Sequence, residues 1–364
     1  MKQITAAPAG PTVKPALATA TYVAPNEAYA ISAAAAQEKC AAGLPKLFVL
    51  GLTAGAYIGF GFSLCLLVGG LMSEQQRAEY PWLFAFVFSI FGFPMGLTAV
   101  IILNLDLFTS NCYLAVIGLA EGCITVLRAL RMLVVSWCTN LLGCVMLVGL
   151  MYAGDVFGGR NADFVIELAI KKTSHSFGVA FVRAVLANWL VCLAVWQSYL
   201  ARDLAGKFIG IFLPVAAFVA MSFEHTVADM YLVSLSMVLG SGISVGTLVG
   251  KMLVPVTLGN IVGGAFFVGA LHTVTLGSPA ATVQSAWERC VADRVARLCR
   301  CRPEDDDAVG TASDSSAAME EGSSTKGRLA GDDSARMGKR WSGASPVPSL
   351  PGSSANLLQM AVAE

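Results

Sequence analysis

The sequence predicts an all-α integral membrane protein in which six helical units form two inverted repeats of three. Three observations favour this fold class. Only 13% of the 364 residues are charged and 56% are hydrophobic, whereas a soluble domain carries roughly 25% charged residues. Two of the six units are interrupted by polar residues at matching places in the two halves. Five apolar stretches share a single charged residue, Arg183; they are 47–70, 82–105, 132–152, 177–200 and 208–222.

Each predicted unit is long enough to cross a hydrocarbon layer, which takes roughly 20 apolar residues. In units two and five the polar interruptions are Asp106–Asn111 and Phe223–Thr226. Lipid cannot hydrogen bond to a broken backbone, so such breaks are surrounded by protein or reached by water. Each broken unit is the second of three, so the halves are inverted and the paired breaks mark a substrate pathway. The units are 46–72, 82–120, 127–152, 176–200, 207–239 and 253–274.

Segments of different composition flank this domain. Residues 1–45 are predicted to be a cytoplasmic tail with an amphipathic helix after Pro25 that lies along the inner membrane surface. Residues 46–277 form the six-helix domain. Residues 278–364 are predicted to be a cytoplasmic, mostly disordered tail, because they turn acidic and rich in Ser, Gly and Pro. Lysines and arginines concentrate in the C-terminal tail and in the loops that lie on the same side of the membrane as the N-terminus. This bias predicts that both termini are cytoplasmic.

Glycines recur at a spacing of four residues, which lets helices approach each other closely. This pattern predicts tight helix packing rather than a ligand site. The three sets are Gly51, Gly55 and Gly59; Gly242, Gly246 and Gly250; and Gly259 with Gly263.

His225 is the strongest candidate for a functional residue, because it is one of three histidines and lies at bilayer depth beside Glu224 in a helix break. Burial favours the neutral imidazole, which donates one hydrogen bond and accepts another. At the mirror position, Asp106 opens a break in which Thr109, with Ser110 and Asn111, offers polar partners. Two half-helix N-termini that meet at the midplane favour a small anion or polar acid; the plainer alternative is that these residues only cap the helices.

Lys39 and Lys172 are candidates for positive charge at the two mouths, although exposed lysines are usually only solvated. A carboxylate concentrated there loses too much hydration to cross as an ion. A low-dielectric passage disfavours its charged form, so we expect the acid to bind a proton and cross neutral. Aromatic and leucine side chains are the candidates for apolar constrictions, namely Phe93, Leu97 and Phe218.

Three motifs in this order resemble the formate/nitrite transporter family over about residues 25–277. They are Asp106–Asn111; Phe223-Glu224-His225 with Ala228; and Leu258–Gly264, which contains Asn260. Lys39, the pair Lys171-Lys172 and the long third-to-fourth loop are most similar to the lactate/proton symporters of apicomplexan parasites.

The resemblance implies an aquaporin-like protomer in a homopentamer, with one pathway per protomer. It implies that His225 is the central histidine, that Thr109 bonds to it, and that Asn260 is the amide of the last span. The vestibule lysines would be Lys39 and Lys172, and the constriction residues Phe93, Leu97 and Phe218. Two departures stand out: Asp229 replaces the family's usual asparagine, and Leu97 replaces the phenylalanine of the related symporters.

The first functional hypothesis is therefore proton-coupled transport of lactate, formate, acetate or pyruvate across the lipid bilayer, with the plasma membrane as the expected location. The alternative on the same scaffold is a nitrite or hydrosulfide anion channel. A water or glycerol pore is disfavoured because neither break contains Asn-Pro-Ala. We expect no enzyme activity, cofactor, metal site or nucleic-acid partner, because no His and carboxylate cluster has metal spacing, no serine or cysteine has an evident base, and the net charge is zero.

Overall fold

The computed structural model describes residues 22–90 and 92–279, and within them the chain is helical apart from loops and one isolated bridge between Tyr22 and Ala201. The first half contains α1 (Pro25–Ala41), α2 (Leu44–Leu71), α3 (Glu74–Glu79), α4 (Pro81–Ile90), α5 (Phe93–Ile102), α6 (Phe108–Ala120) and α7 (Val126–Ala153). The second contains α8 (Arg160–Thr173), α9 (Phe177–Leu200), α10 (Leu204–Ala220), α11 (Thr226–Val238), α12 (Val245–Thr247), α13 (Val254–Gly264) and α14 (Leu271–Leu276).

Membrane-length apolar helices confirm the predicted fold class. Five stretches of the described chain are long and apolar enough to cross a bilayer: Leu44–Leu71, Pro81–Ile102, Val126–Ala153, Phe177–Leu200 and Val245–Leu276. The remaining predicted unit is divided between α10 and α11, each too short to cross alone. The last stretch is not a uniform α-helix, because π-helical turns interrupt it at Leu248–Leu253 and Ala265–Ala270.

The two predicted breaks are present, with shifted boundaries. The first occupies residues 103–107, so Thr109, Ser110 and Asn111 belong to the first turn of α6 rather than to the break. The second occupies residues 221–225, and Thr226 begins α11. These polar residues look like a loop in the sequence because the first turn of a helix carries side chains that bond to neighbouring chain segments.

Unit two contains a further break that the sequence analysis missed. Helix α4 ends at Ile90 and α5 begins at Phe93, with Gly92 between them at a φ of 147°. A Cβ atom on Gly92 would lie 2.6 Å from the backbone nitrogen of Cys65 and 2.6 Å from the carbonyl oxygen of Gly61. Only glycine fits this backbone conformation and this close approach to α2.

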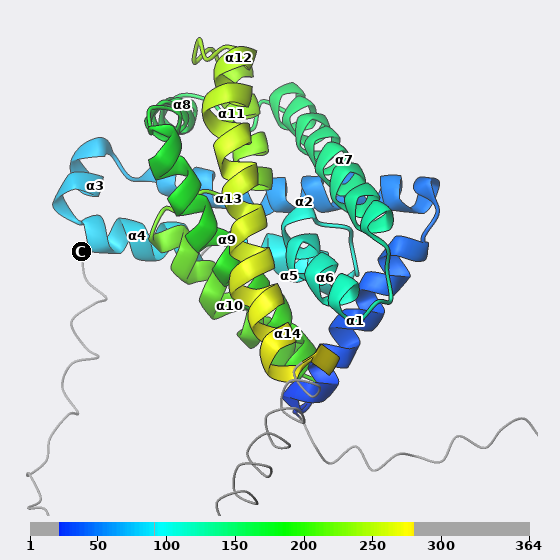
Figure 1. Cartoon of the computed structure of the whole chain (residues 1–364). Coiled ribbons are helices and arrows are strands. Elements are labelled where there is room, and N and C mark those ends of the chain that lie inside the picture. The colour runs from blue at the N-terminus through cyan, green and yellow to red at the C-terminus, as the bar shows by residue number, and fades with distance from the viewer. Residues whose placement is uncertain (1–21, 91, 280–364) are drawn as a thin grey trace, which may run out of the picture. The chain divides into compact units, whose positions relative to one another are not determined.

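Helix α8 corrects the interpretation of residues 160–173 as part of a long loop. It begins the second half as α1 begins the first: each carries a lysine twelve residues before a small residue of the following span, Lys39 before Gly51 and Lys172 before Ala184. Figure 1 shows α1 and α8 at opposite ends of the described bundle, as inverted repeats require. A helix after Pro25 is present as predicted, and α1 buries Tyr29, Ser32 and Cys40 among other residues; its amphipathic character and its position along the membrane surface stay predictions.

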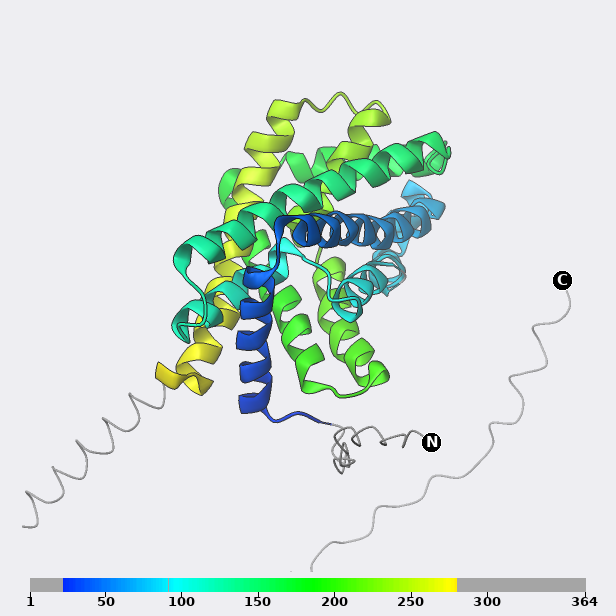
Figure 2. The ribbon, with the colours of Figure 1, turned by 90° about the vertical axis from the view of Figure 1, so that its right-hand side faces the viewer.

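Small residues bring the principal helix pairs together in both halves. A Cβ on Gly143 of α7 would lie 2.0 Å from the Leu52 carbonyl oxygen of α2, and one on Gly263 of α13 would lie 2.3 Å from the Val185 carbonyl oxygen of α9. The predicted packing role holds for Gly55 and Gly259, which also touch neighbouring backbone. It does not hold for Gly242 and Gly250, where a Cβ would meet no atom within 4 Å, or for Gly246, where the nearest atom is Ser244 Oγ at 3.7 Å. These glycines lie in or just after the α11–α12 connection, which Figure 2 shows at the end opposite α1.

A matched pair of substitutions on α7 tests this packing. Gly143→Ala should lower the apparent melting temperature in detergent, because its methyl group overlaps the α2 backbone and overpacking costs about 1–3 kcal/mol. Gly149→Ala adds the same methyl group on the same helix where no atom lies within 4 Å, and should leave the melting temperature equal or higher. Equal effects of the two substitutions would contradict the proposed close contact.

Candidate functional site: two broken helices and the histidine between them

Two buried asparagines hold the broken helices in place. Asn140 of α7 accepts the Phe108 backbone N–H at 2.9 Å and donates to the carbonyl oxygens of Gly51 (2.8 Å) and Asp106 (2.9 Å). Asn260 of α13 accepts the Thr226 backbone N–H at 2.8 Å and donates to the carbonyl oxygens of Ala184 (2.8 Å) and Glu224 (3.1 Å). Each amide oxygen thus accepts a backbone N–H at the start of a helix, where no intrahelical acceptor is available. Each amide nitrogen connects the break to a further span.

An acidic residue lies two positions before each of these helix starts, and a lysine from the opening helix of the same half binds it. Lys39 Nζ lies 3.0 Å from Asp106 Oδ1 and 3.0 Å from the Leu105 carbonyl oxygen. Lys172 Nζ lies 2.5 Å from Glu224 Oε2 and 3.4 Å from the Phe223 carbonyl oxygen. The lysines therefore bind the acid and the carbonyl just before it in the same way.

The plainer alternative for Lys172, an exposed and merely solvated lysine, does not hold in the structure. Lys172 is 6% exposed, and Glu224 and Asp106 are both fully buried. Burial alone would lower the pKa of Lys172, but the neighbouring acids, Glu224 foremost, outweigh it and hold the pKa above the ordinary lysine value. Lys172 is therefore a charged member of a buried ion pair, and the sequence spacing could not show this because Glu224 is 52 residues away.

The two ends differ in the groups around the ion pair. At the Lys39 end, Asn111 Nδ2 donates to Asp106 Oδ1 at 2.8 Å. At the Lys172 end, Arg183 Nε and His175 Nε2 lie 3.8 and 3.7 Å from Glu224 Oε1. Burial, opposed by Glu224, lowers the pKa of His175, so this ring is neutral at pH 7. The Lys172 end thus gathers more titratable groups than the Lys39 end.

His225 lies between the two half-helices, 2% exposed, and its ring bonds fix its tautomer. Its Nδ1 accepts the Ala228 backbone N–H at 3.1 Å, so Nδ1 carries no proton. In the neutral ring the proton is then on Nε2, which donates to Thr109 Oγ1 at 3.0 Å. Thr109 is itself held by Asn188 Nδ2, which donates to the Thr109 carbonyl oxygen at 3.1 Å. The geometry of both ring nitrogens fits neutral imidazole.

Two phenylalanines pack against this ring. The Phe93 and Phe218 ring centres lie 5.9 and 6.0 Å from that of His225 and 5.2 Å from each other. Both were predicted to form a constriction, and both line the small cavity on the Lys172 side. Leu97 is 1% exposed in the core and lines neither this cavity nor the one at Lys39. Its role as a constriction residue therefore stays a prediction.

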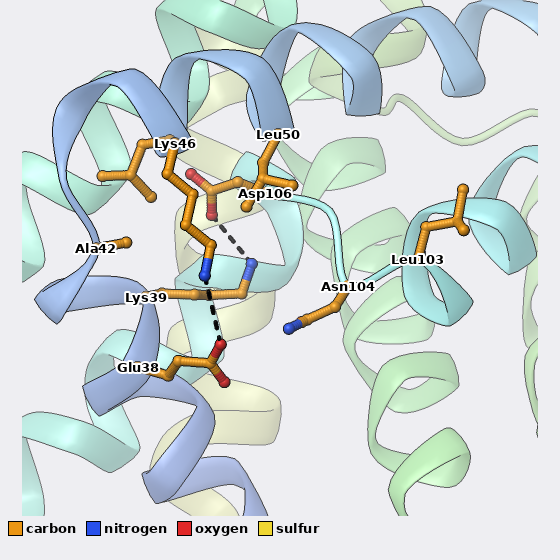
Figure 3. Close-up of a pocket in the computed structure, with 9 residues that line it drawn as sticks. Glu38, Lys39, Ala42, Lys46, Leu50, Leu103, Asn104 and Asp106 are labelled. Carbon is orange, nitrogen blue, oxygen red and sulfur yellow. Dashed lines mark hydrogen bonds and ion pairs between the residues drawn. The ribbon is translucent and has the colours of Figure 1, made fainter.

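Unequal cavities reach the site from its two ends. The Lys39 cavity has a volume of about 240 Å³ and is lined by Glu38, Lys39, Lys46, Asn104 and Asp106 among others. Figure 3 shows the ends of Lys39 and Lys46 converging there, with Asn104 directed toward them. The Lys172 cavity has a volume of about 30 Å³, room for about two waters. The cavity at the Lys39 end of the described chain is thus much larger than the one at the Lys172 end.

The structure brings together nearly all of the predicted pathway residues. Thr109 and His225 touch, while Asp106, Asn111 and Glu224 form the polar clusters on either side. Asn260 has a capping role, because protein groups occupy both its oxygen and its nitrogen. Sequence reasoning missed Asn140 and Asn188, two polar residues inside apolar spans. Asn140 could have been found as the counterpart of Asn260, since both lie in the third span of their half.

Membrane-length helices, paired half-helices and a polar site between them define a multi-pass membrane protein of the transporter or channel class. The sequence model described as "Formate/nitrite transporter" matches residues 26–274. The chain belongs to the formate/nitrite transporter family.

Similar proteins come from archaea, bacteria and a eukaryotic parasite. The chain is 37% identical over 274 residues to a "Probable formate transporter" of Methanothermobacter thermautotrophicus, covering 70% of this chain and 97% of the relative. It is 32% identical to "Formate channel FocA" of Escherichia coli strain K12, covering 63% and 86%. It is 30% identical to "Formate-nitrite transporter 3" of Toxoplasma gondii, covering 67% of this chain and 49% of that relative.

Solved structures support the same fold. An "FNT family ion channel" superposes with a TM-score of 0.60 at 30% identity, covering 69% of this chain and 98% of that one. A "Pentameric formate channel with formate bound" superposes with a TM-score of 0.56 at 30% identity, covering 64% and 97%.

The buried ion pair gives a stability prediction. Lys172→Met should destabilise the fold by about 3–5 kcal/mol, because it leaves Glu224 without its closest cation. Thermal unfolding in detergent measures this as a lower apparent melting temperature, and the double variant Lys172→Met/Glu224→Gln should recover much of the loss. The control is Lys171→Met, an exposed neighbour whose replacement should leave the melting temperature unchanged. A single Lys172 variant as stable as this control would contradict the pairing.

Proposed function

We propose that this protein carries small monocarboxylates such as lactate, formate, acetate and pyruvate across the membrane together with a proton, the acid crossing in its neutral form. The observation that carries the proposal is the bonding of His225. Its Nδ1 accepts a backbone N–H and its Nε2 bonds to Thr109, which is the arrangement of an uncharged ring. Between Phe93 and Phe218, a neutral imidazole offers a carboxylate no opposite charge.

The cost of desolvation then decides the form in which the acid crosses. An unpaired carboxylate in an apolar passage is costly, whereas its protonated form has only a modest polar cost. Lys39 and Lys172 attract the anion at the two ends, in competition with Asp106 and Glu224. The acid binds a proton in one cavity, passes the phenylalanines and His225 as a neutral molecule, and releases the proton on the other side. The transport is electroneutral.

The relatives support the choice of substrate class and the assembly. Formate appears in the names of the archaeal and Escherichia coli relatives, and formate is the smallest monocarboxylate. One solved relative is described as pentameric, so we propose a homopentamer with one pathway in each protomer. We place the protein in the plasma membrane with both termini cytoplasmic, in line with the distribution of lysine and arginine. The similarity of Lys39 and the Lys171-Lys172 pair to the parasite symporters supports lactate.

A small-anion channel for nitrite or hydrosulfide is the second candidate. The observation that favours it is the description of several solved or curated relatives as channels. In that case the anion crosses charged and carries current. The two candidates therefore differ in the electrical signature of transport rather than in the site residues.

Transport in proteoliposomes separates the candidates. For the symporter, an inward proton gradient should drive uptake of labelled lactate or formate, a protonophore should abolish the accumulation, and no net current should accompany the flux. His225→Ala should suppress turnover more strongly than substrate affinity. Uptake that follows membrane voltage and ignores the proton gradient would instead establish the channel, and a near-normal His225→Ala variant would remove the histidine from the mechanism.

The Thr109 hydroxyl gives a finer test of the same site. Thr109→Val preserves size but leaves the ring N–H of His225 unpaired in a buried place, which costs about 1–3 kcal/mol. We expect turnover to fall about 10-fold or more if the ring must be held in this orientation. Thr109→Ser keeps the hydroxyl and should retain most of the activity. Initial uptake rates at fixed pH measure both variants, and equal losses would indicate a packing effect alone.

A further inference from the structure

We propose that Asp229 carries a proton in this protein and passes it to a carboxylate that enters the Lys172 cavity. This inference rests on the proposed function and adds to it a proton-binding residue that acts at one end of the pathway. It comes from a chemical difference between corresponding positions of the two repeats, Asn111 and Asp229.

The repeats place a polar side chain five residues after each buried acid. In the first half this residue is Asn111, whose Nδ2 donates to Asp106 Oδ1 at 2.8 Å. In the second half it is Asp229, five residues after Glu224. An asparagine amide always has hydrogens to donate, whereas a carboxyl group has one only when protonated. To donate a hydrogen bond as Asn111 does, Asp229 must be protonated.

The surroundings of Asp229 favour the protonated form. Its residue is 1% exposed, its Oδ2 has no hydrogen-bond partner, and its Oδ1 is 3.9 Å from Lys172 Nζ. Glu224 forms a closer ion pair with the same ammonium group, at 2.5 Å. Among the described residues, Lys172 is the cation within 4 Å of Asp229, and Glu224 binds it more closely, so an ionised Asp229 would be a poorly compensated buried anion. The N-terminal end of α11 favours negative charge, but this effect is small beside the cost of burying a second anion.

The other charged groups near Asp229 are few, and they leave a positive excess when Asp229 is neutral. Lys172 and Arg183 face one carboxylate, Glu224, while His175 and His225 are neutral. An ionised Asp229 would cancel this excess, and a protonated Asp229 preserves it for an incoming anion. Other titratable groups on α11 and the helices packed against it have partners of their own or face outward: Cys144 donates to the Val227 carbonyl oxygen, Tyr231 of α11 itself bonds to Ser63, and Glu167, Lys171 and Lys251 are exposed.

The proton transfer follows from this position. Asp229, Lys172 and His225 line the same small cavity. A carboxylate attracted by the positive excess takes the Asp229 proton, which leaves a neutral acid and an ionised Asp229. The acid moves on past Phe93 and Phe218, and Asp229 regains a proton from water at that mouth. At the other end Asn111 cannot exchange a proton, so the acid gives its proton directly to water in the larger Lys39 cavity.

Infrared difference spectroscopy tests the protonation without transport. The spectrum of reconstituted wild-type protein at pH 7 should contain the C=O stretch of a buried carboxylic acid, and Asp229→Asn should remove it. The mirror variant Asn111→Asp places a carboxyl beside Asp106 and should add a second such band. A wild-type spectrum identical in this region to that of Asp229→Asn would overturn the proposal.

Exchange of labelled lactate at equal pH on both sides tests proton delivery. In Asp229→Asn only acid already neutral in water can enter, so the rate should fall about 10-fold for each pH unit above the pKa of lactic acid. The wild-type rate should be nearly independent of pH as long as Asp229 holds its proton. Parallel profiles would overturn delivery by Asp229. Current-carrying lactate flux in the wild type would refute the proposed function and the delivery step, while the infrared result would still decide whether Asp229 is protonated.

Discussion

The structure depends on how the ends of broken helices are hydrogen bonded inside an apolar bundle. A helix that starts within a membrane leaves backbone N–H groups that lipid cannot satisfy. Asn140 and Asn260 satisfy them, and each amide also binds a carbonyl oxygen on another span. The starts of α6 and α11 are therefore fixed relative to α2 and α9. The contact between Thr109 and His225, which joins the two halves, follows from this arrangement.

The same scaffold supports two chemically different ends. Both have a lysine bound to a buried acid and to the preceding carbonyl oxygen. One end has an amide and a cavity of about 240 Å³; the other has a carboxyl group, an arginine and a cavity of about 30 Å³. An internal repeat thus conserves backbone geometry while single side chains set the charge at each end. In the proposed mechanism this difference makes the effect of pH directional in a nearly symmetric fold.

The parts of the fold that depend on local composition were predictable from the sequence, and those that depend on distant pairing were not. The length of the apolar stretches predicted the spans. The polar residues inside them predicted the two breaks and the importance of His225. The sequence predicts a loop at α8 because many of its residues are polar. Its correspondence to α1 becomes clear only in the structure. The burial of Lys172 could not be predicted without its partner Glu224, which is far away in the sequence. The break at Gly92 could not be predicted without the position of the α2 backbone.

The location of the charges explains why neutrality, rather than size alone, would select the cargo in the proposed mechanism. The ion pairs that hold the two acids preceding α6 and α11, Lys39–Asp106 and Lys172–Glu224, lie at the two ends of the site. The centre offers a neutral imidazole, a hydroxyl and two aromatic rings. A weak acid can bind a proton before it reaches this centre and so avoids most of the desolvation cost, whereas the anion of a strong acid cannot. A cation fixed at the centre would bind the anion tightly and slow its release.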